Sequence, residues 1–446
     1  MTAPVDAQPD IAVVGGGVLG MTLAMRLRQR GARVTLLEAA PVSGGLAGSE
    51  TIGGYVWDRF YHVILLSDLG TRGLIDELGL GDRLRWGRTR TGFFTDGRLY
   101  SMSNSVEFLR FPPLSLVDKL RLGSTIFAAS RIQDALPLER ELAVDWLQRW
   151  SGRRVLERIW LPLLRSKLGD NYRLASAAFI WAIIARMYAA RRTGLKEEMF
   201  GYVDGGYAVV LQALARRLAE LGVSTLNSAV VERVEDRGAG GVDIRLADGR
   251  CLRSAKAVLT LPTGAVAAVC PQLGAGERER LRGVVYQGIV CGAMLLRKPL
   301  SPYYVTNITD PGIPFTGIIE MTALVDRSRF GSHSLVYLPR YLAQADPAWN
   351  LGDDDFRRQS IDALARMYAH FDLAGVVDFK VSRARQVLAI ATIDYTARAM
   401  PPLKTSLPNV FLVNSAQIAS GTLNVNETLG VVATQLPRLA GALGMP

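Results

Sequence analysis

The 446-residue chain has few of the residues from which metal sites and disulfide frameworks are built. Its three cysteines, Cys251, Cys270 and Cys291, lie far apart and form no CxxC pair. This spacing excludes a zinc ribbon and argues against disulfides, so we expect buried thiols in a reducing compartment. The scattered histidines, cysteines and acidic residues predict no metal site, and the sequence has neither an HExxH motif nor a Ser-His-Asp signature.

Membrane-spanning runs are also scarce. Residues 257–276 and 405–426 are uncharged and about long enough to cross a bilayer, but both runs contain proline and glycine. The polar N-terminus has no basic region followed by an apolar core, so no signal peptide is predicted. We therefore expect a cytoplasmic protein, or one bound peripherally to the inner face of the membrane.

The net charge of +11 comes from one region of the chain. Residues 83–196 contain 21 Lys and Arg against 9 Asp and Glu, whereas the remainder is nearly neutral. Helical periodicity dominates from about residue 69 to 196 and predicts a mostly helical segment. Its basic and apolar residues favour an anionic membrane surface as partner, with a phosphorylated substrate or a solvated basic face as alternatives. No recognition motif accompanies the charge, so nucleic acid is not an expected partner.

The N-terminal residues carry a nucleotide-binding pattern. The apolar run 11–14 predicts a strand, a helix follows the glycine cluster, and residues 33–38 predict a second strand. The cluster satisfies GxGxxG, and an acidic residue ends the second strand. The first glycine permits a tight turn, the second lets the backbone approach a pyrophosphate, and the third lets helix and strand pack. The predicted nucleotide contacts are Gly15, Gly17, Val18, Leu19, Gly20 and Glu38.

Later segments predict strands and helices that belong in turn to a nucleotide-binding part and to a substrate-binding part of the protein. Residues 50–62 look like an extended pair turned at Gly53 and Gly54, short strands follow a helix after residue 206, and a strand and closing helix follow residue 409. The expected fold is α/β, with a Rossmann-type dinucleotide-binding domain and an interleaved substrate domain of mixed sheet and helical cap. The dinucleotide-binding domain would comprise residues 1–68, 200–285 and 386–446, and the substrate domain residues 69–199 and 286–385.

The choice of FAD depends on the residues after Glu38, AAPVSGGLAGS, which contain a second glycine pair. Here the sequence resembles the flavin amine oxidase superfamily, which includes monoamine oxidases, protoporphyrinogen oxidases and phytoene desaturases. The resemblance implies FAD and adds Ala39, Gly44, Gly45, Leu46 and Ala47 to the cofactor site. The usual residue after the pair is Arg, so Leu46 removes one charge contact to the pyrophosphate.

Two further segments carry the resemblance. GVSTLNSAVVERVED resembles the strand whose backbone contacts adenine, at Val231. NVFLVNSAQIASGTLNVNETLG resembles the segment that passes under the isoalloxazine ring, which places Asn414, Gln417 and Asn426 near the pyrophosphate, the ribityl chain or the ring. The usual acid of this segment is absent. VWDRFYHVI and FPPLSLVDKLRLG resemble the bacterial protoporphyrinogen-oxidase-like branch.

The candidate catalytic residue is His62, which lies in VWDRFYHVI, the segment that the resemblance places beside the flavin. An imidazole there can orient a substrate or move a proton, and a packing role is an equal alternative. Asp58 can orient His62 or cap the turn.

The function implied is an FAD-dependent oxidoreductase. It would remove a hydride from a CH–CH or CH–N bond of a hydrophobic, lipid-like or anionic substrate, with FAD bound non-covalently. The electron acceptor stays open among oxygen, a quinone and another carrier. The alternative is a non-redox flavoenzyme resembling UDP-galactopyranose mutase, which acts on a sugar nucleotide.

Overall fold

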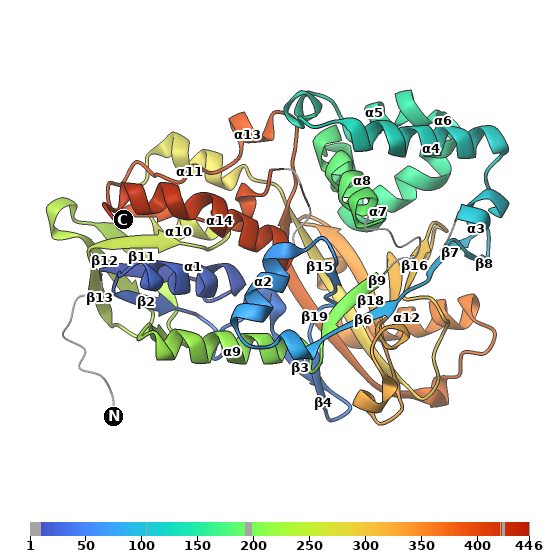
Figure 1. The fold of residues 1–446 in the computed structure, drawn as a ribbon, viewed down its shortest axis with the longest axis horizontal. Coiled ribbons are helices and arrows are strands. Elements are labelled where there is room, and N and C mark those ends of the chain that lie inside the picture. The colour runs from blue at the N-terminus through green and yellow to red at the C-terminus, as the bar shows by residue number, and fades with distance from the viewer. Residues whose placement is uncertain (1–9, 104, 192–198, 420, 422–423, 446) are drawn as a thin grey trace.

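The computed structural model describes residues 10–103, 105–191, 199–419, 421 and 424–445. Figure 1 shows two halves side by side. The half that holds the C-terminus is built on a parallel sheet with other elements packed on both of its faces. In the other half, a bundle of helices lies above a long twisted sheet.

The parallel sheet begins with the two strands expected near the N-terminus. Its strand order is β10-β2-β1-β14-β20, and every neighbouring pair is parallel. The strands are β1 (Ile11–Val14), β2 (Val34–Leu37), β10 (Ser224–Leu226), β14 (Lys256–Leu259) and β20 (Val410–Leu412). They come from the start, middle and end of the chain, as the interleaved pattern predicts.

Alternation along β1 divides the two faces of this sheet. Ile11 and Val13 face a core made with α1 (Val18–Gln29), α9 (Tyr207–Glu220) and α14 (Val425–Ala442). Ala12 and Val14 face the opposite core, because successive side chains of a strand point to opposite sides. That second core contains a three-stranded sheet and α10 (Thr263–Val269), with α11 (Ala275–Arg282) packed beside α10. The three strands are β11 (Val231–Asp236), β12 (Val242–Leu246) and β13 (Cys251–Ser254).

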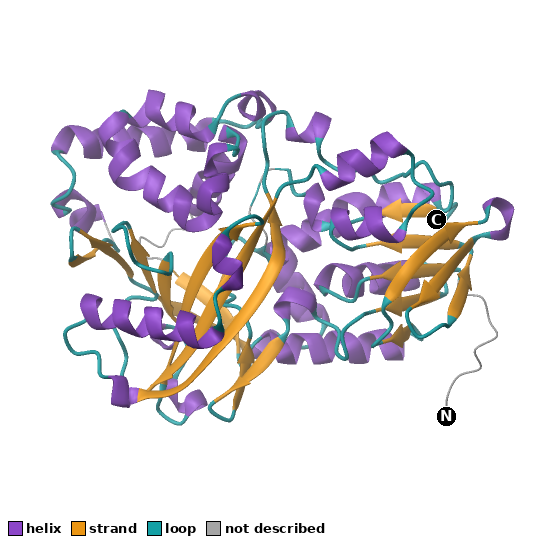
Figure 2. Cartoon of the chain, turned by 180° about the vertical axis from the view of Figure 1, so that it is seen from behind, coloured by secondary structure: helices purple, strands orange, loops and turns teal. Residues whose placement is uncertain are grey.

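The second half is organised by a seven-stranded sheet of order β19-β15-β18-β17-β16-β7-β8. Met294 and Leu296 of β15 pack under α12 (Asp353–Met367), which Figure 2 shows lying across the sheet. Cys291 and Leu295 point to the other face, where they pack with residues of the segment 52–65. The strands are β7 (Thr91–Thr95), β8 (Arg98–Ser101), β15 (Tyr286–Leu296), β16 (Val305–Ile308), β17 (Gly317–Glu320), β18 (Ser334–Ala343) and β19 (Val376–Ala389).

Short strands join the two halves. The expected extended pair is the hairpin β3 (Ser49–Ile52) and β4 (Tyr55–Asp58), turned at Gly53 and Gly54, both with positive φ. A three-stranded sheet follows, of order β5-β9-β6, with β5 (Ile64–Leu65), β9 (Met199–Val203) and β6 (Leu84–Arg88). Next to it, α2 (Leu69–Glu77) packs against α14.

The helical cap is the bundle formed by residues 105–191. It contains α3 (Ser105–Arg110), α4 (Leu116–Arg131), α5 (Ala143–Ser151), α6 (Arg153–Val155), α7 (Leu161–Leu168) and α8 (Ala177–Arg191). The expected mostly helical segment begins too early, because residues 84–101 form β6, β7 and β8. These strands pair with partners distant in sequence, β9 and β16. The prediction of helix for residues 84–101 is therefore wrong.

Three further expectations from the sequence can be compared with the structure. Cys270 and Cys291 are buried, but Cys251 is exposed, which corrects the expectation of three buried thiols. Among the described residues, no helix has both the length and the apolarity to cross a bilayer. The division into two discontinuous domains stays a prediction, and β19 runs through its boundary at residue 386.

Candidate active site

The loop after β1 requires glycine at two positions. Gly15 has a φ of +110°, and a Cβ there would lie 2.4 Å from Thr260 Oγ1. A Cβ on Gly20 would lie 1.8 Å from Gly15 O, because α1 packs directly on the end of β1. Thr260 Oγ1 donates to Val14 O and Gly15 O and fixes the turn from the neighbouring strand. The mechanical roles expected for Gly15 and Gly20 are those the structure shows.

Gly17 has a different surrounding. It is the N-cap of α1, no side chain caps the helix, and a Cβ at this position would meet only Gly45 Cα, at 3.9 Å. Val18 and Leu19 open the helix, whose first N–H groups lack intrahelical acceptors and carry the positive end of its dipole. An uncapped helix start beside glycine backbone is a cradle that fits a pyrophosphate and that a Cβ would fill.

The second glycine pair docks on the first loop. Gly44 N–H donates to Gly16 O at 2.8 Å, and Gly44 forms a parallel bridge with Gly17. Leu46 and Ala47 continue as a short 3-10 turn, Gly45–Ala47. Arg59 Nη2 donates to Gly45 O at 2.9 Å, so a guanidinium reaches the pair from another segment.

Glu38 binds the backbone on both sides of the nucleotide loop. Its Oε2 accepts from Gly16 N–H at 2.6 Å, and its Oε1 accepts from Ala40 N–H at 2.8 Å, across the exposed Ala39. Each carboxylate oxygen has a further lone pair for a ribose hydroxyl. Ala229 N–H donates to Glu38 O at 2.8 Å, which brings the start of β11 and its Val231 alongside.

The three amide residues of the C-terminal segment bond to protein. Asn414 Nδ2 donates to Leu261 O at 2.9 Å, beside the glycine loop. Gln417 Nε2 donates to Leu412 O at 3.2 Å, and Asn426 Oδ1 accepts from Gly70 N–H of α2 at 3.0 Å. Their contacts with the cofactor stay predictions, and residues 420, 422 and 423 of this segment lie outside the described residues.

His62 lies beside Asp58, as one of the two interpretations of Asp58 requires. His62 Nδ1 is 3.6 Å from Asp58 Oδ2, and the histidine ring centroid is 4.9 Å from that of Tyr207. Asp58 is buried, and its Oδ1 accepts from Tyr207 N–H at 2.7 Å, at the start of α9. Asp58 therefore contacts the histidine and caps the helix at once. His62 Nδ1 itself is buried and makes no hydrogen bond within the described chain.

Next to His62 is a polar cluster that sequence reasoning missed. Tyr61 and Tyr341 share a hydrogen bond between their hydroxyl oxygens at 2.9 Å, and Lys167 Nζ donates to Tyr61 OH at 3.2 Å. The Lys167 ammonium also lies 5.2 Å from the centroid of the Tyr341 ring. Burial raises the pKa of Tyr61 to about 12, so it stays a neutral phenol. The cluster joins α7 of the cap to β18, and only Tyr61, adjacent to His62, carried a sequence signal.

Comparison with known proteins places the chain among flavoproteins. A family model described as flavin-containing amine oxidoreductase matches residues 20–423. Coproporphyrinogen III oxidase of Mycobacterium tuberculosis is 29% identical over 226 residues, 46% of this chain and 50% of that protein. Carotenoid phi-ring synthase of Streptomyces griseus is 28% identical over 303 residues, 60% of this chain and 55% of that protein. The chain thus spans about half the length of the curated relatives it matches.

A solved structure of similar shape confirms the fold. An oxidoreductase from Methanosarcina mazei superposes with a TM-score of 0.75, at 15% identity, covering 96% of this chain and 99% of that one. At that identity the likeness concerns the fold alone, and it agrees with the α/β architecture expected from the sequence.

Proposed function

The chain belongs to the flavin-containing amine oxidoreductase family, with FAD as its cofactor, and from this premise we propose that it removes a hydride from a CH–CH or CH–N bond of a hydrophobic, anionic substrate. The substrate would lose a hydride and, to a base, a proton, and an external oxidant such as oxygen or a quinone would take the electrons afterwards. When bound, the isoalloxazine ring supplies the hydride acceptor.

The observation that carries this proposal is the cluster of Tyr61, Tyr341 and Lys167. Among the described residues, the polar partners of Lys167 are phenols rather than carboxylates, and its ammonium keeps donors for a further acceptor. The two rings offer apolar surface beside that cation. A site with an aromatic wall and one cation suits a hydrophobic molecule that carries an anionic group.

The chain's own residues would hold the cofactor without a covalent bond. The N–H groups that open α1 at Gly17, Val18 and Leu19 would bind the pyrophosphate, and Glu38 would accept from the ribose hydroxyls. Arg59, held at Gly45, would supply the guanidinium that Leu46 does not. Acid precipitation should release the flavin, since no cysteine or histidine is assigned to a covalent link.

His62 is the residue we propose to hold or move a proton. Its Nδ1 is buried, makes no hydrogen bond within the described chain and lies 3.6 Å from Asp58 Oδ2, so the carboxylate would hold the ring in place. The cap would exclude water from the reacting bond, because α7 packs on β18 over the same cluster.

The names of the relatives support a hydrophobic substrate class. One matched protein is named for a porphyrinogen and another for a carotenoid. Both kinds of molecule have extended carbon skeletons, and a substrate of that class that also bears carboxylates would match the aromatic wall and Lys167.

The test is anaerobic mixing of the yellow holoenzyme with a carboxylated porphyrinogen, followed by flavin absorbance. Bleaching of the oxidised flavin is expected. In Lys167→Met the substrate concentration for half-maximal bleaching should rise roughly tenfold or more, the usual effect of losing a charged partner, with bleaching intact at saturation. Turnover of a sugar nucleotide only by pre-reduced enzyme, without bleaching, would instead establish the mutase-like alternative.

We also propose that the cap docks on an anionic membrane surface. Leu116, Leu120 and Phe127 are more than half exposed, and they recur at helical spacing along α4. The Arg131 guanidinium lies 5.0 Å from the Phe127 ring centroid, at the edge of this apolar stripe, and Arg110 is exposed nearby on α3. Apolar residues bordered by cations suit a helix that lies in a bilayer interface.

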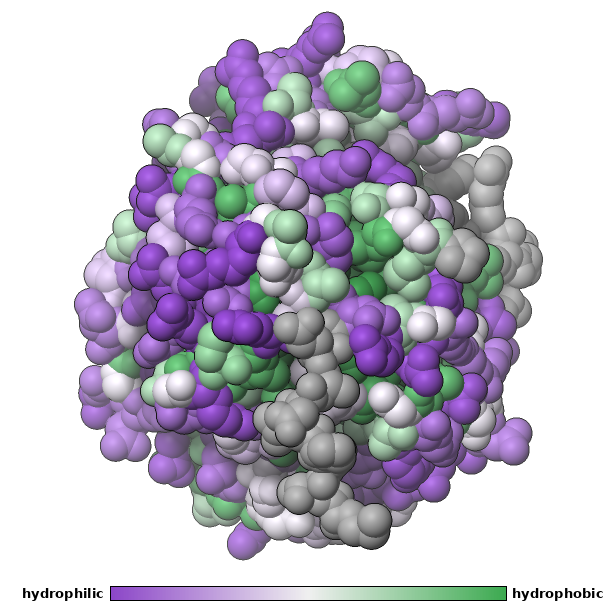
Figure 3. Space-filling model, turned by 90° about the vertical axis from the view of Figure 1, so that its left-hand side faces the viewer, coloured by the Kyte–Doolittle hydropathy of each residue, from purple (hydrophilic) through white to green (hydrophobic). Residues whose placement is uncertain are grey.

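Figure 3 looks onto the end of the molecule away from the cap, where hydrophilic residues are interspersed with apolar patches. Several cap arginines are engaged in ion pairs, such as Arg153 with Glu157 and Arg158 with Asp96, so the attraction would depend mainly on cations beside α4.

A further inference from the structure

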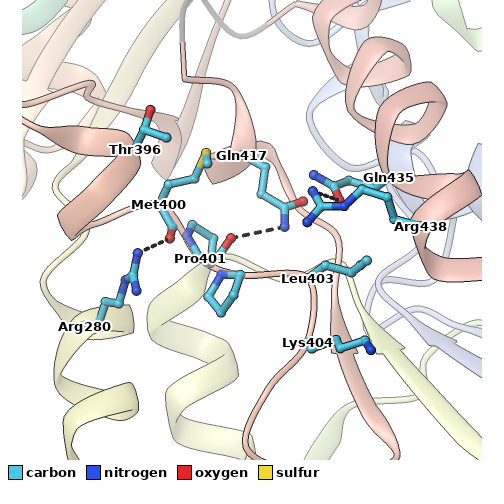
Figure 4. A pocket seen from close by; sticks show the side chains of 10 residues that line it. Arg280, Thr396, Met400, Pro401, Leu403, Lys404, Gln417, Gln435 and Arg438 are labelled. Atoms are coloured by element: carbon cyan, nitrogen blue, oxygen red, sulfur yellow. Dashed lines mark hydrogen bonds between the residues drawn. The ribbon is translucent and has the colours of Figure 1, made fainter. Parts of the chain in front are cut away.

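A cavity of about 430 Å³ lies on the flank of the half that contains the parallel sheet, outside the glycine loop and away from His62 and the Tyr61–Tyr341–Lys167 cluster. Its walls come from α11, from α13 (Tyr395–Arg398) and the chain that follows it, from α14, and from Gln417, one of the predicted cofactor residues (Figure 4). Gln435 lies ten residues after the start of α14, about 15 Å along the helix axis. None of the residues that line the cavity belongs to the nucleotide loop.

The lining of this cavity is strongly basic. Arg280, Lys404 and Arg438 line it, and no carboxylate is among its ten lining residues. Arg438 Nη1 donates to Gln435 Oε1 at 3.3 Å, a neutral partner that leaves the positive charge uncompensated. Arg280 Nη2 donates to Met400 O at 2.9 Å, while Arg280 Nε is buried and makes no hydrogen bond within the described chain. The cavity therefore gathers three positive charges with donors to spare.

The backbone that presents these groups is held firmly. Gln417 Nε2 donates to both Pro401 O and Leu412 O, the first of which Figure 4 draws as a dashed line. Leu412 N–H donates to Leu403 O, and Lys404 forms an antiparallel bridge with Phe411. Because this segment is tied to β20, Lys404 is positioned by the sheet rather than by a free loop.

We propose that this cavity binds a small organic phosphate. A phosphate ester carries close to two negative charges at neutral pH, and Arg and Lys bind it by charge-assisted hydrogen bonds. Pro401, Pro402 and Leu403 form an apolar wall that would contact the carbon part of the ligand. The volume falls within the range of small-molecule sites. Gln417 links the cavity wall to Asn414 N–H, so an occupant would brace the segment that enters the cofactor side.

The experiment uses holoenzyme, so that FAD fills the nucleotide loop, and titrates it calorimetrically with glycerol 3-phosphate at constant ionic strength. The variants are Lys404→Gln and Arg438→Gln, because Arg280 also supports backbone carbonyls. The matched control is Arg216→Gln, an exposed arginine on α9 of the same half. Saturable binding of one ligand is expected, weakened about 10- to 100-fold in each cavity variant and unchanged in the control. Flavin absorbance and melting temperature should stay constant across all four proteins.

Three results would overturn the assignment of this cavity to a phosphate ligand. These are the absence of saturable binding at millimolar phosphate, equal weakening in the Arg216 control, or binding of citrate in preference to both glycerol 3-phosphate and inorganic phosphate. The last result would assign the cavity to polycarboxylates. Binding of inorganic phosphate as tight as that of the ester would show that the apolar wall plays no part, and would contradict an organic ligand.

Discussion

Two glycines of the loop after β1 should respond differently to an added methyl group, one by losing FAD and the other by losing stability. Gly17→Ala introduces a Cβ that meets only Gly45 Cα at 3.9 Å, so the protein should fold but lose FAD, because the methyl group occupies the pyrophosphate approach. Gly20→Ala places its Cβ 1.8 Å from Gly15 O and should destabilise the fold itself. Flavin content and melting temperature of both variants separate the effects. A Gly17→Ala protein that keeps its full flavin content contradicts the assignment.

A substitution at His62 distinguishes a chemical role of this residue from a packing role. His62→Phe keeps an aromatic ring beside Tyr207, so FAD should remain bound, while flavin reduction by substrate should slow by about 10²–10⁴ if the imidazole moves a proton. Stopped-flow absorbance measures this rate. An unchanged rate would leave His62 as a packing residue, and loss of FAD would make it structural.

Glu320 should make stability depend on pH. It is fully buried on β17, its Oε2 accepts from Leu300 N–H at 3.0 Å, and burial raises its pKa from 4.5 to about 7. The unfolded chain ionises near pH 4.5 and the folded chain near pH 7. The stability present below pH 4.5 is therefore lost progressively as the pH rises toward 7.

Glu320→Gln keeps an acceptor for Leu300 N–H but cannot ionise. Relative to the parent protein, the variant should gain on the order of 3 kcal/mol, at most, between pH 4.5 and pH 8. Urea unfolding at several pH values measures the difference. Parallel curves of unfolding free energy against pH for the two proteins would show that the pKa of this carboxyl is the same in the folded and the unfolded chain.

At the scale of elements, α4 offers the test of membrane docking. Leu120→Asp puts a charge in the middle of the exposed apolar stripe and should cut binding to anionic vesicles roughly tenfold or more, since it also removes about 2 kcal/mol of apolar burial. Leu373→Asp, at a similarly exposed apolar position outside the cap, is the matched control. Vesicle flotation at low and high salt measures both.

Parent protein that floats equally with neutral and anionic vesicles, or whose binding ignores salt, would contradict the electrostatic part of this docking. No flotation with either kind of vesicle at low salt would remove the membrane and leave an anionic substrate or a solvated basic face.

Strands β6–β8 show where sequence patterns are insufficient. Residues 84–101 alternate too little to exclude a helix, and they become strands because β9 and β16, distant in sequence, pair with them. Strand β19 did carry a signal, since VVDFKVSRARQVLA alternates apolar and polar residues over most of its length. Four strands of the parallel sheet, β1, β2, β14 and β20, were predictable because each is a short and mostly apolar run, whereas β10 has the sequence STL.

At the scale of the whole molecule, the same distinction divides the site. The glycine loop and Glu38 lie within one βαβ unit, so their spacing alone predicts their meeting. Lys167 and Tyr341 meet only because α7 packs on β18, and Arg59 reaches Gly45 only through the turn of the β3–β4 hairpin. Residues brought together by tertiary packing leave no fixed spacing in a single sequence.

The order in which the strands of the parallel sheet occur in the chain has a consequence for biosynthesis. A ribosome completes β1, β2, β10 and β14 by residue 259, yet β20, which pairs with β14, emerges only after residue 410. Until then the edge of β14 offers unpaired backbone groups to any other nascent strand. Asn414, which binds Leu261 O beside the glycine loop, is also absent from the nascent chain. We therefore expect the parallel sheet to be completed only late in translation, and a stalled or truncated chain to expose an open sheet edge to chaperones and proteases.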